Sequence, residues 1–97
     1  MNYRRLGRSG LEVPTLTLGT MMFGDRTDEA TAREIVAHAR DAGVNFIDTA
    51  DAYAAGASER ITGQALRDLG VARDEVVVAT KVFGRMGKGP NAAGASR

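Results

Sequence analysis

Three side chains of this 97-residue sequence have the types and spacing needed for proton transfer. Asp48 and Lys81 each follow an apolar run typical of a strand, and neighbouring parallel strands lie about 4.8 Å apart, so the carboxylate and the ammonium can pair. Tyr53 follows Asp48 closely enough to fold back from its loop to the same point. An ammonium beside a phenol favours release of the phenolic proton, and we therefore predict that Tyr53 is a proton donor.

The same residues also have simpler explanations. Asp48 and Lys81 could form a structural ion pair at the edge of a sheet. Tyr53 could be a loop residue that packs its ring and leaves its hydroxyl in water. The elements that carry the residues decide between these readings.

Apolar runs typical of strands alternate with amphipathic helical segments along the chain. We predict strands buried on both faces at residues 16–18, 44–48 and 76–80, and helices at 28–42 and 58–69. Thr27 and Ser58 are the expected N-caps of the helices, and Gly43 and Gly70 are the expected terminating glycines. This order implies right-handed crossovers into a parallel sheet, where ligands bind at the C-terminal ends of the strands.

The sequence also predicts the structure of the segments outside this β/α unit. Residues 1–14 are expected to form a hairpin that turns at Gly7-Arg8-Ser9-Gly10, residues 15–83 the β-α-β-α-β unit, and residues 84–97 a loop. The glycines of that loop surround Lys88, but no Ser or Thr follows the lysine as a P-loop requires. Ser96 resembles the N-cap of a further helix, so we expect the chain to be part of a longer fold.

Composition excludes several classes of function. The net charge of +1, from 13 basic and 12 acidic residues that are interspersed, gives no field for nucleic acid or anionic lipid. No apolar run is long enough to span a bilayer, and the absence of cysteine fits a reducing compartment, so a cytoplasmic protein is expected. No metal site is predicted, because the acid beside Ser58 has no partner at ligand spacing.

The segment Asp48-Thr49-Ala50-Asp51-Ala52-Tyr53, followed by Gly56, Ser58-Glu59, Gly63 and Leu66, resembles the signature of the aldo-keto reductases. Residues 3–13, the loop 18–24 and Ala79-Thr80-Lys81 resemble the same family. The resemblance implies an α/β fold, namely the N-terminal portion of a (β/α)₈ TIM barrel with a β-hairpin, about three parallel strands and two helices. Ala54 departs from the pattern, since glycine commonly follows the tyrosine.

The resemblance also implies a function: NADPH-dependent reduction of small-molecule aldehydes and ketones to alcohols. Its catalytic residues would be Tyr53 as the acid, Lys81 as the group that makes the phenol more acidic, and Asp48 as the partner of Lys81. Thr20, Met21 and Asp48 would bind the cofactor, NADPH or NADP⁺. The family's catalytic histidine would lie beyond residue 97, and His38 matches no catalytic position.

Two functions remain open at this point. The first is a carbonyl reductase that is fully active only in a longer chain, because about 250 residues are needed to close such a barrel. The second is a non-catalytic barrel fragment or a regulatory, cofactor-binding relative that acts as an interaction module. Neither the substrate nor the oligomeric state follows from the sequence.

Overall fold

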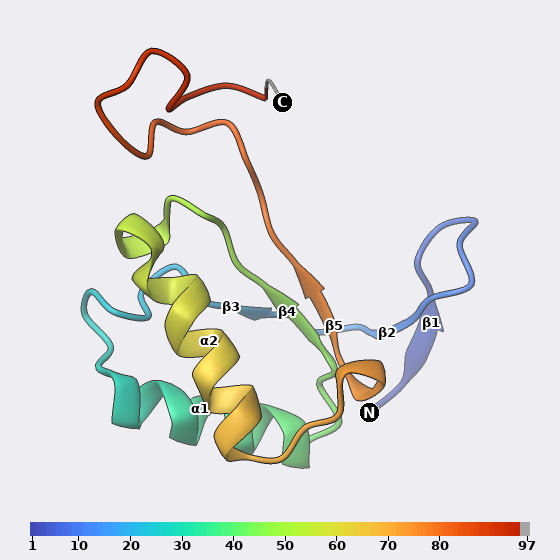
Figure 1. The fold of residues 1–97 in the computed structure, drawn as a ribbon. Helices are drawn as coiled ribbons and strands as arrows, with labels where there is room; N and C mark the ends of the chain where they lie inside the picture. Colours follow the sequence, from blue (N-terminus) through green and yellow to red (C-terminus); the bar gives the residue numbers. More distant parts are fainter. Residues whose placement is uncertain (96–97) are drawn as a thin grey trace.

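Three parallel strands form the larger of the two described sheets (Figure 1). In the computed structural model, which describes residues 1–95, β3 (Leu18–Gly19), β4 (Phe46–Asp48) and β5 (Val77–Ala79) pair in that order. The predicted order and direction are therefore confirmed. The strands are shorter than predicted, and Leu16, expected in the first strand, lies outside it with 62% of its surface exposed.

The register aligns the C-terminal ends of the three strands. Gly19 is opposite Asp48, and Asp48 is opposite Ala79. Each strand is followed at once by a threonine, and we call these residues, Thr20, Thr49 and Thr80, the threonine row. Because side chains alternate between the faces of a strand, the threonine row lies on the face opposite Asp48.

Two helices lie on the same side of the sheet (Figure 1). The helices α1 (Glu29–Asp41) and α2 (Ala57–Asp68) pack against one another through a core of apolar side chains, Phe23, Ala32, Val36, Ile61 and Ala65. Burying a Val, Ile or Phe side chain contributes about 1.5–3 kcal/mol each relative to exposure. Leu18 of β3 packs against this core, which ties the helix pair to that strand.

The two helix starts differ from the sequence prediction. Asp28, not Thr27, caps α1, because its Oδ1 accepts a hydrogen bond from the backbone N–H of Thr31 at 2.8 Å. That bond also holds the pKa of the Asp28 carboxyl below its ordinary value. Ser58 does not cap α2, since the helix already begins at Ala57 after Gly56, whose φ of 97° lies in the left-handed region.

The predicted helix ends are correct. Gly43 has a φ of 89° and Gly70 a φ of 68°, and each follows the C-cap of its helix. A left-handed residue at this position lets the chain turn away from the helix axis, which glycine does without steric cost. A Cβ at Gly43 would also meet Met1 Cβ and Tyr3 OH at 2.9 Å.

The strands are not buried on both faces as predicted. In β4 only Ile47 is buried, while Phe46 and Asp48 are partly exposed, and the residues of β5 are all partly exposed. The helices cover one face, and no described element covers the other. In a closed barrel that second face points toward the interior, where side chains from the other strands fill the space.

A hairpin precedes the parallel sheet, and two short 3₁₀ helices lie between its elements. The strands β1 (Tyr3–Arg5) and β2 (Glu12–Pro14) form an antiparallel hairpin, closed by a hydrogen bond from Leu6 N to Leu11 O. Two short 3₁₀ helices, η1 (Tyr53–Gly56) and η2 (Arg73–Glu75), precede α2 and β5. The described residues after β5 contain turns and bends only, and Ser96, the expected cap, lies outside the described residues.

None of the helices within residues 1–95 combines the length and the apolar character that crossing a membrane would require.

Candidate active site

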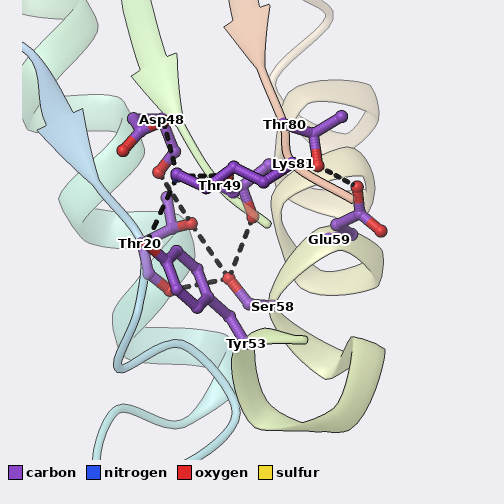
Figure 2. A network of polar contacts seen from close by, with 8 residues as sticks. All are labelled: Thr20, Asp48, Thr49, Tyr53, Ser58, Glu59, Thr80 and Lys81. Atoms are coloured by element: carbon purple, nitrogen blue, oxygen red, sulfur yellow. Dashed lines mark hydrogen bonds and ion pairs between the residues drawn. The ribbon is translucent and has the colours of Figure 1, made fainter. Parts of the chain in front are cut away.

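The ammonium of Lys81 lies at the centre of the predicted site (Figure 2). Its Nζ donates to Asp48 Oδ1 at 2.9 Å, to the carbonyl oxygen of Thr49 at 2.9 Å and to Tyr53 OH at 3.3 Å. An ammonium has three N–H donors, so each donor has one acceptor and the group is held from three directions. The structure therefore brings Asp48, Tyr53 and Lys81 together.

The charge of Lys81 is stabilised in this position. The hydrogen bond to Asp48 raises its pKa most, and the hydrogen bond to Tyr53 and the negative charge of Asp48 act in the same direction against partial desolvation. The Lys81 and Asp48 side chains remain 49% and 40% exposed. Ion pairs this exposed contribute little to stability, so the arrangement matters for where it holds the charge.

An unusual turn follows Tyr53 and leads into α2. Ala54 and Ala55 both adopt left-handed backbone conformations, with φ of 50° and 54°, and the chain then enters α2 through Gly56. Left-handed backbone costs about 1–2 kcal/mol for a residue with a Cβ, so core packing and hydrogen bonds elsewhere must hold this turn in place. The phenol oxygen accepts from Lys81, which leaves its own O–H free to donate to a ligand.

Thr20 and Met21, predicted to contact a cofactor, lie in the loop after β3. Both line an open depression of about 350 Å³ that also has Asp48 and Tyr53 in its wall. The Met21 side chain is 56% exposed and offers an apolar surface. Thr20 is only 1% exposed, and its Oγ1 donates to the Asp48 carbonyl at 3.2 Å, so its hydroxyl is occupied inside the protein.

Two residues at the start of α2 contact the strand ends, although their place in the sequence predicts only the start of a helix. Ser58, with 0% exposure, donates to the carbonyl oxygen of Thr20 at 2.6 Å and lies 3.2 Å from Thr49 Oγ1. Glu59 Oε2 accepts from Thr80 Oγ1 at 2.5 Å. A signal in the sequence is the threonine at or near the C-terminal end of each predicted strand, since residues at equivalent positions of neighbouring strands face the same side of the sheet.

Among residues 1–95, no group of three or more His, Cys, Asp and Glu side chains comes close enough together to hold a metal ion.

Comparison with known proteins identifies the family. Residues 15–97 match the model of the aldo/keto reductase family, and the chain belongs to that family. A holo structure of the aldo-keto reductase AKR11C1 from Bacillus halodurans superposes with a TM-score of 0.79 and 40% identity, over 94% of this chain and 29% of that one. The α/β fold is accordingly that of the N-terminal part of a (β/α)₈ barrel.

Two curated relatives are similar to the chain over most of its length. A protein of Oryza sativa subsp. japonica, described as a probable voltage-gated potassium channel subunit beta, is 51% identical over 100% of this chain. The uncharacterized oxidoreductase YrpG of Bacillus subtilis is 48% identical over 86% of it. The chain spans 30% and 27% of the lengths of these relatives.

Proposed function

We propose that this chain is the first third of an enzyme that reduces aldehydes and ketones to alcohols with NADPH. The observation that carries the proposal is the position of Lys81, whose Nζ bonds both to Asp48 Oδ1 and to Tyr53 OH. A phenol with a free O–H beside a fixed positive charge is the arrangement that proton donation to a carbonyl oxygen needs.

Each residue has a separate task in this reaction. Tyr53 donates its proton to the carbonyl oxygen of the substrate, and the Lys81 ammonium stabilises the phenolate that remains. Asp48 holds the ammonium in place and balances its charge. NADPH, when bound, supplies the hydride for the carbonyl carbon, so one hydride and one proton convert the carbonyl to an alcohol.

The cofactor assignment rests on the depression beside these residues. Its volume of about 350 Å³ and its wall of Met21, Asp48 and Tyr53 suit the nicotinamide end of a dinucleotide, which is flat and partly apolar. Met21 would contact the ring through its exposed side chain. Thr20 would contribute mainly by shaping the wall, since its hydroxyl is already bonded to the Asp48 carbonyl. The holo form of the Bacillus halodurans relative supports a bound cofactor.

The test uses a full-length barrel that carries residues 1–97 as its first third, which we call the complete barrel. Purified complete barrel should oxidise NADPH in the presence of an aromatic aldehyde, followed by the loss of NADPH absorbance. Tyr53→Phe should lower kcat by roughly 10²–10⁴-fold, the usual contribution of a positioned acid, while NADPH still binds. Wild-type turnover by Tyr53→Phe would show that Tyr53 is not the acid.

A second candidate function comes from the plant relative. That protein is described as a probable potassium channel subunit, and its identity to this chain, 51%, is as high as that of the oxidoreductase relative, 48%. On this alternative the barrel would serve as a regulatory subunit of an ion channel. Complete barrel that binds NADPH without turning over any carbonyl in a panel of aldehydes and ketones, and that co-purifies with a co-expressed potassium channel, would favour it.

A further inference from the structure

The strand ends are joined to α2 on the face opposite the candidate active site (Figure 2). Ser58 contacts two members of the threonine row, Thr20 and Thr49, and Glu59 contacts the third, Thr80. Two consecutive residues of one helix therefore hold the ends of all three strands. Asp48 is the last residue of β4, and Lys81 lies two residues beyond the end of β5.

The path from Ser58 to the site is short. Ser58 holds Thr20, and both the backbone N–H and the Oγ1 of Thr20 donate to the carbonyl of Asp48, at 3.1 and 3.2 Å. Ser58 also bonds to the side chain of Thr49, whose carbonyl oxygen accepts from Lys81 Nζ at 2.9 Å. Two of the three acceptors around the ammonium, from Asp48 and Thr49, are thus anchored through one buried hydroxyl.

Glu59 contacts the end of the third strand, β5. It accepts from Thr80, the residue directly before Lys81, so the backbone that carries the ammonium is tied to the same turn of α2. The core that α2 forms with α1 holds that turn against α1, and Leu18 of β3 packs against the same core. A rigid element beneath a polar site is what allows its groups to be held at reacting distance.

We propose that Ser58 and Glu59 are positioning residues, which set the distances among Asp48, Tyr53 and Lys81 by binding the threonine row from behind. Neither residue is required to touch substrate or cofactor. The inference rests on the proposed function, because the distances matter for turnover only if Tyr53 donates a proton. Its structural part, control of the Lys81 environment, can be measured without turnover.

The principal variant is Ser58→Ala in the complete barrel, and the matched control is Thr62→Val. Thr62 is a buried hydroxyl one turn later on the same helix, 2% exposed, and its Oγ1 has no hydrogen-bond partner within the described part of the chain. Ser58→Ala should lower kcat roughly 10–100-fold, the scale of a misplaced reacting group, with NADPH affinity changed less than about twofold. Thr62→Val should leave both near wild type.

A second variant covers the case in which Ser58→Ala does not fold. Thr80 is exposed, so Thr80→Val removes its hydroxyl at nearly constant shape without disturbing the core, whereas Thr80→Ser keeps the hydroxyl. Thr80→Val should lower kcat and Thr80→Ser should restore most of it. A loss of side-chain volume alone would give the opposite order.

Two readouts separate positioning from general damage. In a Lys81→Met background, Ser58→Ala should cause no further loss of kcat, because the group that Ser58 positions is absent. If Ser58→Ala caused a general defect instead, its loss of kcat would multiply with the loss from Lys81→Met. Titration of Lys81 Nζ by NMR should give a lower pKa in Ser58→Ala than in wild type, since the contact with Asp48 is loosened.

The outcomes decide the two proposals separately. If wild-type complete barrel oxidises no NADPH with any carbonyl, the proposed function is wrong, and the Lys81 titration still decides the positioning role. An unchanged Lys81 pKa in both Ser58→Ala and Thr80→Val overturns the inference. So does a loss of kcat in Thr62→Val equal to that in Ser58→Ala.

Discussion

Lys81 Nζ lies 2.9 Å from Asp48 Oδ1, although 33 positions separate the two residues in the chain. The contact depends on the parallel pairing of β4 and β5, which places Asp48 opposite Ala79. Lys81 follows Ala79 by two residues, so its side chain lies on the same face of the sheet as that of Asp48. The site is a product of strand register, and its electrostatics can be tested at these two residues.

Asp48→Asn should lower the pKa of Lys81 toward its ordinary value of 10.5, because the hydrogen bond to Asp48 is the largest cause of the upward shift and the charge of Asp48 adds to it. A raised pKa in the folded state stabilises the fold at pH below 10.5, and this contribution is lost as pH rises through the higher folded value. NMR titration of Lys81 in the complete barrel measures the shift. Asp51→Asn is the control, and an equal effect of both variants would contradict the assignment.

Lys81→Met should lower kcat on the order of 10²-fold while NADPH binding remains near wild type, because the methionine fills similar space but carries no charge. The measurement is the steady-state kcat with an aromatic aldehyde, alongside NADPH affinity by fluorescence titration. If Lys81→Met and Tyr53→Phe act on one step, the double variant should be no slower than the slower single variant. Fully multiplicative losses would separate their roles.

Ala54→Gly should stabilise the complete barrel by about 0.5–1 kcal/mol, because a left-handed backbone strains alanine and not glycine, and part of the gain is lost to the freer unfolded chain. Urea unfolding gives the change in free energy. Ala52→Gly is the matched control, since Ala52 has a right-handed φ of −84° and should be destabilised by the same replacement. Destabilisation by both variants would refute the strain.

Asp28→Ala should lower the midpoint of thermal unfolding by a few degrees, while Thr27→Ala should have a much smaller effect. Asp28 supplies the acceptor for the Thr31 N–H at the start of α1, and without it that donor loses its partner. Because the folded-state pKa of Asp28 lies below 3.8, its contribution is present above pH 3.8 and is lost as pH falls further. Equal effects of Asp28→Ala and Thr27→Ala at neutral pH would contradict the assignment of the cap to Asp28.

The isolated polypeptide of residues 1–97 should show no carbonyl reduction and should be poorly folded or self-associated. β3 and β5 each have one paired neighbour among the described residues, and unpaired strand edges invite association. Urea unfolding with size-exclusion chromatography and an NADPH oxidation assay checks this. A cooperative monomeric transition accompanied by turnover would contradict it.

The order of the elements could be predicted because each has a periodic signal. The run around Ile47 and the run around Val78 are strand-like, and Gly43 and Gly70 mark helix ends, so Asp48 and Lys81 could be placed at neighbouring strand ends. Details that depend on competition between neighbouring residues could not be predicted. Thr27 and Asp28 are both good caps, and the extended backbone of Asp28 together with its hydrogen bond from Thr31 N–H decides between them.

The contacts of Ser58 with the threonine row could not be predicted from the sequence for a related reason. Serine before a helical pattern usually caps the helix, and the sequence gives no sign that Gly56 starts the helix earlier in a left-handed conformation. Likewise, nothing local indicates that Ala54 and Ala55 adopt conformations that favour glycine. The packing of α2 on the strand ends overrides both local preferences.

Side chains alternate between the two faces of the sheet along residues 77–81, and this alternation determines which mutations the segment tolerates. Thr80 faces α2 and Lys81 faces Asp48, so inserting or deleting one residue between Val77 and Lys81 would exchange the two faces and point the ammonium into the helix layer. Many side-chain replacements would leave this geometry intact. Over evolutionary time residues 77–79 should therefore vary more readily than Thr80 and Lys81, while changes in length accumulate in the turns between elements and not at the strand ends.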